Sequence, residues 1–502
     1  MESLIKTIQD LSPYKALLES LKSDSPQPGL GLSRAARLPF LSALHADLDQ
    51  VVLLVTDRAD HALSLFDELE FWVGDTPRFH FAEPNPLFYE QAAWGIATRR
   101  ERLQTLTGLA RYHLPFAEKS EKPPIIVTSA RSLMTRSLPR RDFLKACKRL
   151  SVGQTIQPEL LLRSWVEFGY QRVDTVLEPG QFSHRGGLLD VWPPSEPYPA
   201  RLDFFGDEID TIRRFDPASQ RTVEKLEALL ITPAREFLNP DSSDLSDQLD
   251  QSDQLSEFHI PLLHKTPATL LDYLPQKALV LIDDVSMVAS VANEVEEQAL
   301  NFRQESVIEG TLDDDFPIPY LTWSELDDII HSRTWLELGH STVIETPSHS
   351  GRGDRGEGEF NNLASCFSHD ERFGGRLKPF VDYLGTLIDA DERAIIISRQ
   401  SPRLQELWRE SREQVSESNP TFIEASLSEG FVLTNDESLL VTHLITDSEV
   451  FGWERPQPRL RQRQVAEAPE SLYADLLEGD YVVHVDHGIG RFSGLVQRQL
   501  EG

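Results

Sequence analysis

Positive charge is scarce in this sequence. Its 502 residues carry 49 lysine and arginine side chains against 81 aspartate and glutamate side chains, a formal net charge of -32 at pH 7. A surface of this sign repels the phosphate backbone of nucleic acids unless basic residues gather locally. We therefore expect contacts with DNA to be weak or indirect. A protein partner with a basic face would suit this acidic surface better than DNA does.

Cysteine is also rare, and long apolar runs are missing. Cys147 and Cys366 lie far apart, with no second thiol or His/Cys cluster near either, so the sequence suggests neither a disulfide framework nor a zinc site. A reducing compartment is the simplest interpretation. The first residues lack the charged-then-apolar pattern of a signal peptide, and no run approaches about 18 apolar residues. We expect a cytoplasmic protein without membrane contact.

The sequence lacks the motifs of the common catalytic sites. No Gly-Lys-Ser/Thr occurs, so the phosphate-binding loop of nucleotidases is absent; residues 29–34 (GLGLSR), the nearest glycine-rich segment before a helix, have no lysine. Residues 279–284 (LVLIDD) could end in a Mg²⁺-binding acid, but a strand followed by an N-capping aspartate is favoured. H-E-x-x-H and G-x-S-x-G are missing too. We predict no catalytic, cofactor-binding or metal-binding residue, and no enzyme activity for this chain.

Two stretches have an α/β pattern, 1–149 and 234–347. Each contains apolar runs followed by helical spacing, and the opening segment to Lys22 is predicted to be one helix. Strands and helices that alternate with short connections indicate a parallel sheet covered on both faces. The runs expected to form its strands are residues 51–55, 125–127 and 278–282.

Between these stretches, residues 150–233 have short alternating runs separated by Gly, Pro and Asp, which predicts a small inserted domain with an antiparallel sheet. Five aspartates spaced three apart in residues 241–253 favour a solvated linker. A linker at 348–378 precedes a small α/β domain at 379–457, whose expected elements are a strand at 394–397, a helix at 403–413 and strands at 430–433 and 439–445.

The last residues form a separate pattern. A polar linker at 458–474 leads to residues 475–502, where Tyr481 and Val483 alternate with other residues before a Gly-Ile-Gly turn. This predicts the start of a β-barrel whose closing strands would lie beyond residue 502. His484 and His487 are interpreted as surface residues of a partner-binding barrel rather than as metal ligands.

One side-chain constellation points to binding. Arg185 precedes a Gly-Gly turn, Arg201 opens the strand RLDFF, and Phe205 ends it. Arginines that can form paired hydrogen bonds with carboxylates, beside an aromatic ring, are typical of protein-binding hot spots. Alternatively, Phe205 belongs to the core and the two arginines pair internally with one of three nearby aspartates, Asp190, Asp203 or Asp207. Composition alone leaves both interpretations open.

A family resemblance rests on residues 169–222, which contain GY-x-R, G-x-F-x-x-RGG-x-LDV-x-P, R-x-x-FF-x-DEID and FD-x-x-x-QR. This pattern resembles the UvrB-interaction domain shared by the excision protein UvrB and the bacterial transcription-repair coupling factors (Mfd). Residues 477–495 are similar to the CarD-like polymerase-interacting domain of the coupling factors, which UvrB lacks. The lysine-free residues 29–34, and residues 86–90 in place of UvrB's aromatic hairpin, also favour the coupling factors.

The resemblance implies a fold and a set of sites. The fold is α/β multidomain: a degenerate P-loop-like (UvrB-like) parallel sheet split by an antiparallel α+β UvrB-interaction domain, then a small α/β domain and the start of an SH3/Tudor-like barrel. UvrA would be bound by Arg185, Arg201 and Phe205. The β subunit of RNA polymerase would be contacted, weakly or not at all because of truncation, by Tyr481, Val483, His484, His487, Gly488 and Arg491.

The resemblance also implies a function. The chain would be the non-catalytic adaptor half of an ATP-dependent DNA translocase, recruiting UvrA for nucleotide excision repair to RNA polymerase stalled at DNA damage. ATP and Mg²⁺ would belong to the family's motor, which these residues do not include. Two alternatives are a UvrB-like damage-loading helicase and a polymerase-binding regulator that acts through the terminal segment.

Overall fold

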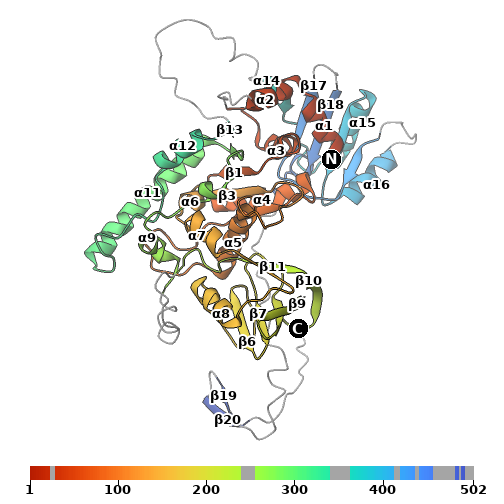
Figure 1. The fold of residues 1–502 in the computed structure, drawn as a ribbon. Coiled ribbons are helices and arrows are strands. Elements are labelled where there is room, and N and C mark those ends of the chain that lie inside the picture. Colours follow the sequence, from red (N-terminus) through yellow and green to blue (C-terminus); the bar gives the residue numbers. More distant parts are fainter. Residues whose placement is uncertain are drawn as a thin grey trace. The chain divides into compact units, whose positions relative to one another are not determined.

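A computed structural model describes residues 1–22, 29–238, 255–339, 362–411, 419–435 and 440–455, and the backbone of two strands at 481–484 and 488–491 (Figure 1). The chain forms two compact units. The first comprises Met1–Ala146 with Glu236–Leu460, and the second comprises Cys147–Arg235 with Arg461–Gly502. The predicted linkers 241–253 and 458–474 lie outside the described residues.

The first unit contains a five-stranded parallel sheet with the order β13-β12-β1-β3-β2. Its strands are β1 (Val52–Thr56), β2 (Arg78–Phe81), β3 (Ile125–Ser129), β12 (Leu279–Ile282) and β13 (Trp335–Glu337). The predicted strands are confirmed as β1, β3 and β12. Strand β1 lies between β3 and β12, so segments from both sides of the second unit pair directly, with Val52 opposite both Ile125 and Leu279.

Helices surround this sheet, and α4 contacts β1, β2 and β3 (Figure 1). The single helix predicted to Lys22 is two helices that break at Leu11, since Pro13 lacks the N–H needed to continue a helix but is tolerated in the first turn of a new one. The helical elements are α1 (Glu2–Asp10), α2 (Ser12–Lys22), α3 (Arg34–Leu48), α4 (Ala59–Val73), α5 (Ile96–Ala110), α6 (Ala130–Met134), α7 (Arg140–Ala146), η1 (Glu257–His259), α9 (Ile260–Leu263), α10 (Leu270–Tyr273), α11 (Val285–Ile308) and α12 (Trp323–His331).

A second sheet in the same unit has the order β14-β17-β18-β15-β16 and mixes parallel and antiparallel pairs. The predicted strands and helix of the small α/β domain are found there. Residues 362–368, assigned to a linker from the sequence, form α14 and β14, and β14 pairs with β17. The elements are α14 (Asn362–Ser365), β14 (Phe367–Ser368), α15 (Leu377–Asp389), β15 (Arg393–Ile397), α16 (Ser401–Ser411), β16 (Thr421–Ile423), β17 (Phe431–Asn435), β18 (Leu440–Thr446) and α17 (Asp447–Phe451).

The two sheets of the first unit share one apolar core. Side chains of α1 and α3, including Leu4 and Phe40, belong to the same buried cluster as Val52 of β1 and Phe431 of β17. Burial of each such side chain stabilises the fold by about 1.5–3 kcal/mol. This continuity makes the second sheet part of the first unit.

The second unit contains the predicted antiparallel sheet, six strands in the order β10-β9-β8-β7-β6-β5, with only β5 and β6 parallel. Trp165 of α8 packs against Phe182 of β6, with ring centroids 5.6 Å apart. The elements are β4 (Lys148–Ser151), α8 (Pro158–Glu167), β5 (Gln171–Arg172), β6 (Gln181–Arg185), β7 (Leu188–Val191), β8 (Ala200–Phe205), β9 (Glu208–Phe215), β10 (Thr222–Leu226) and β11 (Ala228–Ile231).

After residue 455 the structure describes one two-stranded antiparallel sheet, β19 (Tyr481–His484) and β20 (Gly488–Arg491). The SH3/Tudor-like barrel therefore stays a prediction. In the part of the chain that is described, no helix has both the length and the apolar character needed to span a membrane.

Candidate protein-binding surface

One face of the six-stranded sheet carries the arginine constellation. Its strand register places Asp190 of β7 opposite Arg201 of β8, and Arg201 opposite Arg213 of β9. Successive residues of a strand point to opposite faces. The intervening row, Leu189, Leu202 and Ile212, is buried. The charged row therefore lies on the opposite, outer face.

Arg201 is paired internally. Its Nε and Nη2 donate to the two carboxylate oxygens of Asp190 at 2.7 and 2.8 Å, and Nη2 also donates to Gln220 Oε1 at 3.0 Å. The guanidinium lies 4.6 Å from the ring centroid of Phe215, and the side chain is 21% exposed. Hydrogen bonding to Asp190 raises the pKa of Arg201. For this residue the internal-pairing interpretation, left open by the sequence, holds.

Asp203 also has internal partners. It accepts hydrogen bonds from Thr211 Oγ1 at 2.5 Å and from Arg213 Nη2 at 3.3 Å. These partners come from β9, and the charge of Asp203 also contributes to the raised pKa of Arg201. The outer face is thus cross-linked by ion pairs that join β7, β8 and β9.

Arg185 and Phe205 are placed differently. The guanidinium of Arg185 is exposed and donates to Asp174 O at 2.5 Å and Thr175 Oγ1 at 3.0 Å, and no ion pair with a carboxylate is found for it among the described residues. Phe205 is 83% exposed. The interpretation of Phe205 as a core residue is therefore wrong: Phe204 is the residue opposite the buried Ile209, and Phe205, the next residue along the strand, points to the other face, opposite Glu208.

The turns bring these two residues to the same end of the sheet. Gly186 and Gly206 have φ angles of +60° and +63°, which L-residues rarely adopt, and they form the β6–β7 and β8–β9 turns. Phe204 N donates to Gly187 O at 2.8 Å, so the two turns are adjacent. Leu188 lies opposite Arg185 on one side and Asp203 on the other, and is 38% exposed. We call Arg185, Leu188 and Phe205 the turn surface.

The part of the second unit that contains the six-stranded sheet is nearly balanced in charge. Residues 147–235 contain 11 basic and 13 acidic side chains, which leaves 38 basic and 68 acidic side chains in the rest of the sequence. Most of the net negative charge therefore lies outside this segment. An arginine on the turn surface can attract an acidic group without a strong opposing field from its own domain.

Three amides of the glycine-rich segment at 29–34, those of Leu30, Gly31 and Leu32, already have backbone acceptors. Leu30 N and Leu32 N donate to Glu337 O and Leu338 O at 3.0 and 2.8 Å, so the segment runs along the edge of β13. Asp284 caps α11 by accepting a hydrogen bond from Met287 N at 3.1 Å. The strand-and-cap interpretation of residues 279–284 is confirmed.

The aromatic residues at 86–90 are packed inside the first unit. Phe88 and Tyr89 are buried, with the Phe88 ring 4.8 Å from that of Tyr320 and the Tyr89 ring 6.1 Å from that of Phe316. Rings held in this way are not presented to nucleic-acid bases.

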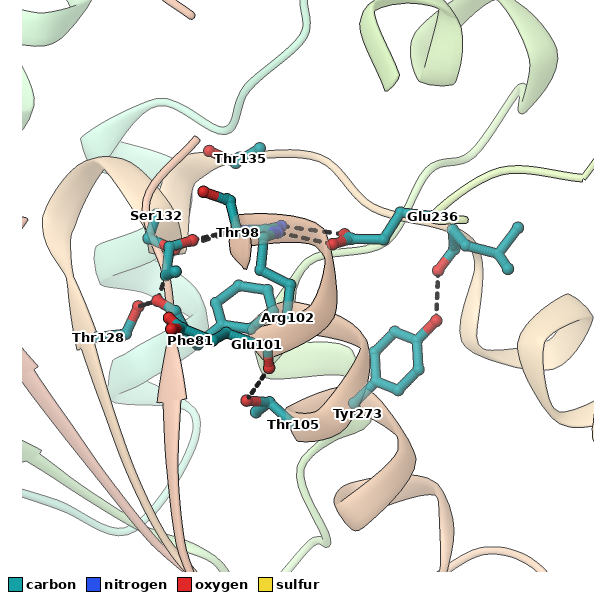
Figure 2. Close-up of polar contacts among 12 residues, drawn as sticks. Phe81, Thr98, Glu101, Arg102, Thr105, Thr128, Ser132, Thr135, Glu236 and Tyr273 are labelled. Carbon is teal, nitrogen blue, oxygen red and sulfur yellow. Dashed lines mark hydrogen bonds and ion pairs between the residues drawn. The ribbon is translucent and has the colours of Figure 1, made fainter. Parts of the chain in front are cut away.

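A buried ion pair, missed by the sequence analysis, anchors the chain where it returns from the second unit (Figure 2). Arg102 Nε and Nη2 donate to Glu236 Oε1 and Oε2 at 2.6 and 3.0 Å, and these side chains are 0% and 1% exposed. Arg102 Nη1 donates to Ala82 O and Ser132 Oγ, and its guanidinium lies 3.8 Å from the Phe81 ring centroid. No local pattern could indicate this contact, since its partners are 134 positions apart.

The predicted polymerase-binding residues lie mainly in the terminal strands. Tyr481 pairs with Arg491, and His484 with Gly488; Val483 also lies in β19, while His487 is outside the described residues. Elsewhere, in the residues with described side chains, no three His, Cys, Asp or Glu residues gather in a metal-binding arrangement.

Comparison with known proteins gives two family matches and several relatives. The UvrB interaction domain matches residues 149–237, and the CarD-like/TRCF RID domain matches residues 476–502. The transcription-repair-coupling factor of Bacillus subtilis (strain 168) is 25% identical over 548 residues, which cover 100% of this chain and 45% of that protein. That of Myxococcus xanthus is 28% identical over 549 residues, covering 98% and 44%.

The chain thus spans less than half the length of these relatives. The expected resemblance is confirmed along the whole chain, and the UvrB interaction domain coincides with the sheet that carries the turn surface. By these matches the chain is similar along its length to the first part of the transcription-repair-coupling factors, with one segment that matches the UvrB interaction domain and another that matches the CarD-like/TRCF RID domain.

Proposed function

We propose that this chain is an adaptor that recruits UvrA to RNA polymerase stalled at DNA damage, as a step of nucleotide excision repair. The observation that carries the proposal is the exposed Phe205 ring beside Arg185 in the domain that matches the UvrB interaction family. A large aromatic side chain left in water at the end of a rigid sheet costs free energy that a partner can recover. Arg201, on the same face, is the third residue assigned to UvrA binding.

The second partner is RNA polymerase. The match of residues 476–502 to the CarD-like domain supports a contact with its β subunit through the segment that contains β19 and β20. This match also favours the second candidate function, a polymerase-binding regulator. An adaptor would make this contact with RNA polymerase and would bind UvrA as well.

We assign no catalysis to this chain. In support, residues 29–34 have no lysine, and their amides at Leu30 and Leu32 already donate to the carbonyl oxygens of Glu337 and Leu338. The buried Phe88 and Tyr89 argue against a helicase that threads DNA past aromatic rings. In our proposal, ATP and Mg²⁺ serve the remaining part of the full-length relatives, DNA is contacted weakly or indirectly, and the chain acts in the cytoplasm.

The test is a binding measurement between the 502-residue chain and purified UvrA. Phe205→Ala should weaken binding at least about thirtyfold, the effect of losing a hot-spot aromatic worth about 2 kcal/mol or more. Val223→Ala, which truncates an exposed apolar residue on β10 of the same sheet, is the matched control and should bind as wild type. Equal affinity of the wild type and Phe205→Ala would refute the proposal.

A further inference from the structure

We infer that Leu188 is a direct contact of the UvrA-binding surface, and that Arg201 supports this surface as a positioning residue without touching the partner. The inference rests on the proposed function and divides its residues into two roles. It follows from exposure, strand register and hydrogen bonding within the second unit.

Leu188 is the apolar centre of the turn surface. Its strand position faces Arg185 across β6 and Asp203 across β8, on the outer face of the sheet. It is 38% exposed, although the neighbouring Leu189 is buried. A partner that covers the Phe205 ring and reaches Arg185 must also cover the side chain between them, because the two turns are adjacent. An apolar patch with one cation at its rim fits a pocket with apolar walls and an acidic group at its edge.

Arg201 has little left to offer a partner. Its guanidinium forms a two-pronged contact with Asp190, a third hydrogen bond with Gln220 and a stacked contact with the Phe215 ring. To contact UvrA it would have to give up charge-assisted bonds that the folded chain already makes.

The Asp190 contact also explains how Arg201 acts on binding. Asp190 and Leu188 are two positions apart on β7 and lie on the same face, so the ion pair ties the Leu188 strand to β8. Asp190 is itself buried, and removal of Arg201 would leave its carboxylate unpaired. An unpaired buried charge is costly, whereas replacement of both partners by apolar residues is often neutral.

A double-mutant cycle distinguishes the two roles of Arg201. Arg201→Met should weaken UvrA binding by about tenfold or more because the Asp190 carboxylate loses its partner. Arg201→Met combined with Asp190→Leu should restore binding to within about threefold of the wild type, since no unpaired charge remains. A direct contact would be lost equally in the single and double variants, so a double variant as weak as Arg201→Met overturns the positioning role.

The contact role of Leu188 has its own measurement. Leu188→Ala should weaken UvrA binding about tenfold with an unchanged unfolding midpoint, and Leu160→Ala, an exposed truncation on α8, should change neither. Wild-type affinity of Leu188→Ala overturns the inference, while Phe205→Ala can still support the proposed function. If the wild-type chain does not bind UvrA, both fail together.

Discussion

Replacing Glu236 by glutamine tests the contact that anchors the chain's return to the first unit (Figure 2). In the wild type both carboxylate oxygens accept hydrogen bonds from Arg102, and neither side chain reaches solvent. The glutamine amide keeps one acceptor oxygen and turns its NH₂ group toward a donor. Arg102 then remains buried without a counter-charge, so we expect a loss of about 3–5 kcal/mol in the free energy of unfolding.

Urea unfolding followed by tryptophan fluorescence measures this loss, since the Trp94 ring lies 4.6 Å from the Arg102 guanidinium. With a urea dependence of about 2–3 kcal/mol per molar, the midpoint of the first unit's transition should fall by roughly 1–2.5 M. Asp60→Asn, which breaks the exposed pair of Asp60 with Arg58, is the control and should change the free energy by about 1 kcal/mol at most.

The reasoning also predicts the behaviour of a double variant. Arg102→Met with Glu236→Leu removes both charges and should be more stable than Glu236→Gln alone. A wild-type midpoint for Glu236→Gln would refute the anchoring role of the pair. A double variant less stable than Glu236→Gln would show that packing, including the Phe81 stacking, outweighs the charge interaction.

Two further predictions concern buried groups in the two units. Burial lowers the pKa of His443, but hydrogen bonds and charges from Asp370 at 2.9 Å and Glu392 at 3.0 Å outweigh this effect and leave the pKa raised. A raised pKa gives stability that is complete below about pH 6.5 and is lost as the pH rises through the folded-state pKa. The melting temperature of the wild type should therefore fall more between pH 6 and pH 9 than that of His443→Gln. Parallel curves of melting temperature against pH for the two proteins would contradict this prediction. Burial raises the pKa of Cys147 to about 12, and Cys366 is buried as well, so a thiol reagent at pH 8 should modify both only after unfolding in urea; fast modification of the native chain would disprove their burial.

The strands at the centre of the first sheet were predictable because they are buried on both faces. Residues 52–56, 125–129 and 279–282 form β1, β3 and β12, and uninterrupted apolar runs are the direct consequence of that burial. The edge strands β2 and β13 were missed, because partly exposed edges admit the polar residues of RFHF and WLE. Local capping was also predictable, since Asp284 bonds to an amide three residues away.

The sequence alone therefore determined short-range features: the spacing of apolar residues in strands and helices, the helix cap at Asp284, the inserted antiparallel sheet and the motifs that carry the resemblance. Tertiary structure decided the state of each candidate side chain. Arg201 and Phe205 are four positions apart on one strand, yet Arg201 is paired with Asp190 and Phe205 is open to solvent. The reason is that Arg201 lies opposite Asp190 of the neighbouring strand β7, whereas Phe205 lies where β8 ends and the turn begins. The pairing of Arg102 with Glu236 likewise depends on how the chain returns after an inserted unit, which no local pattern records.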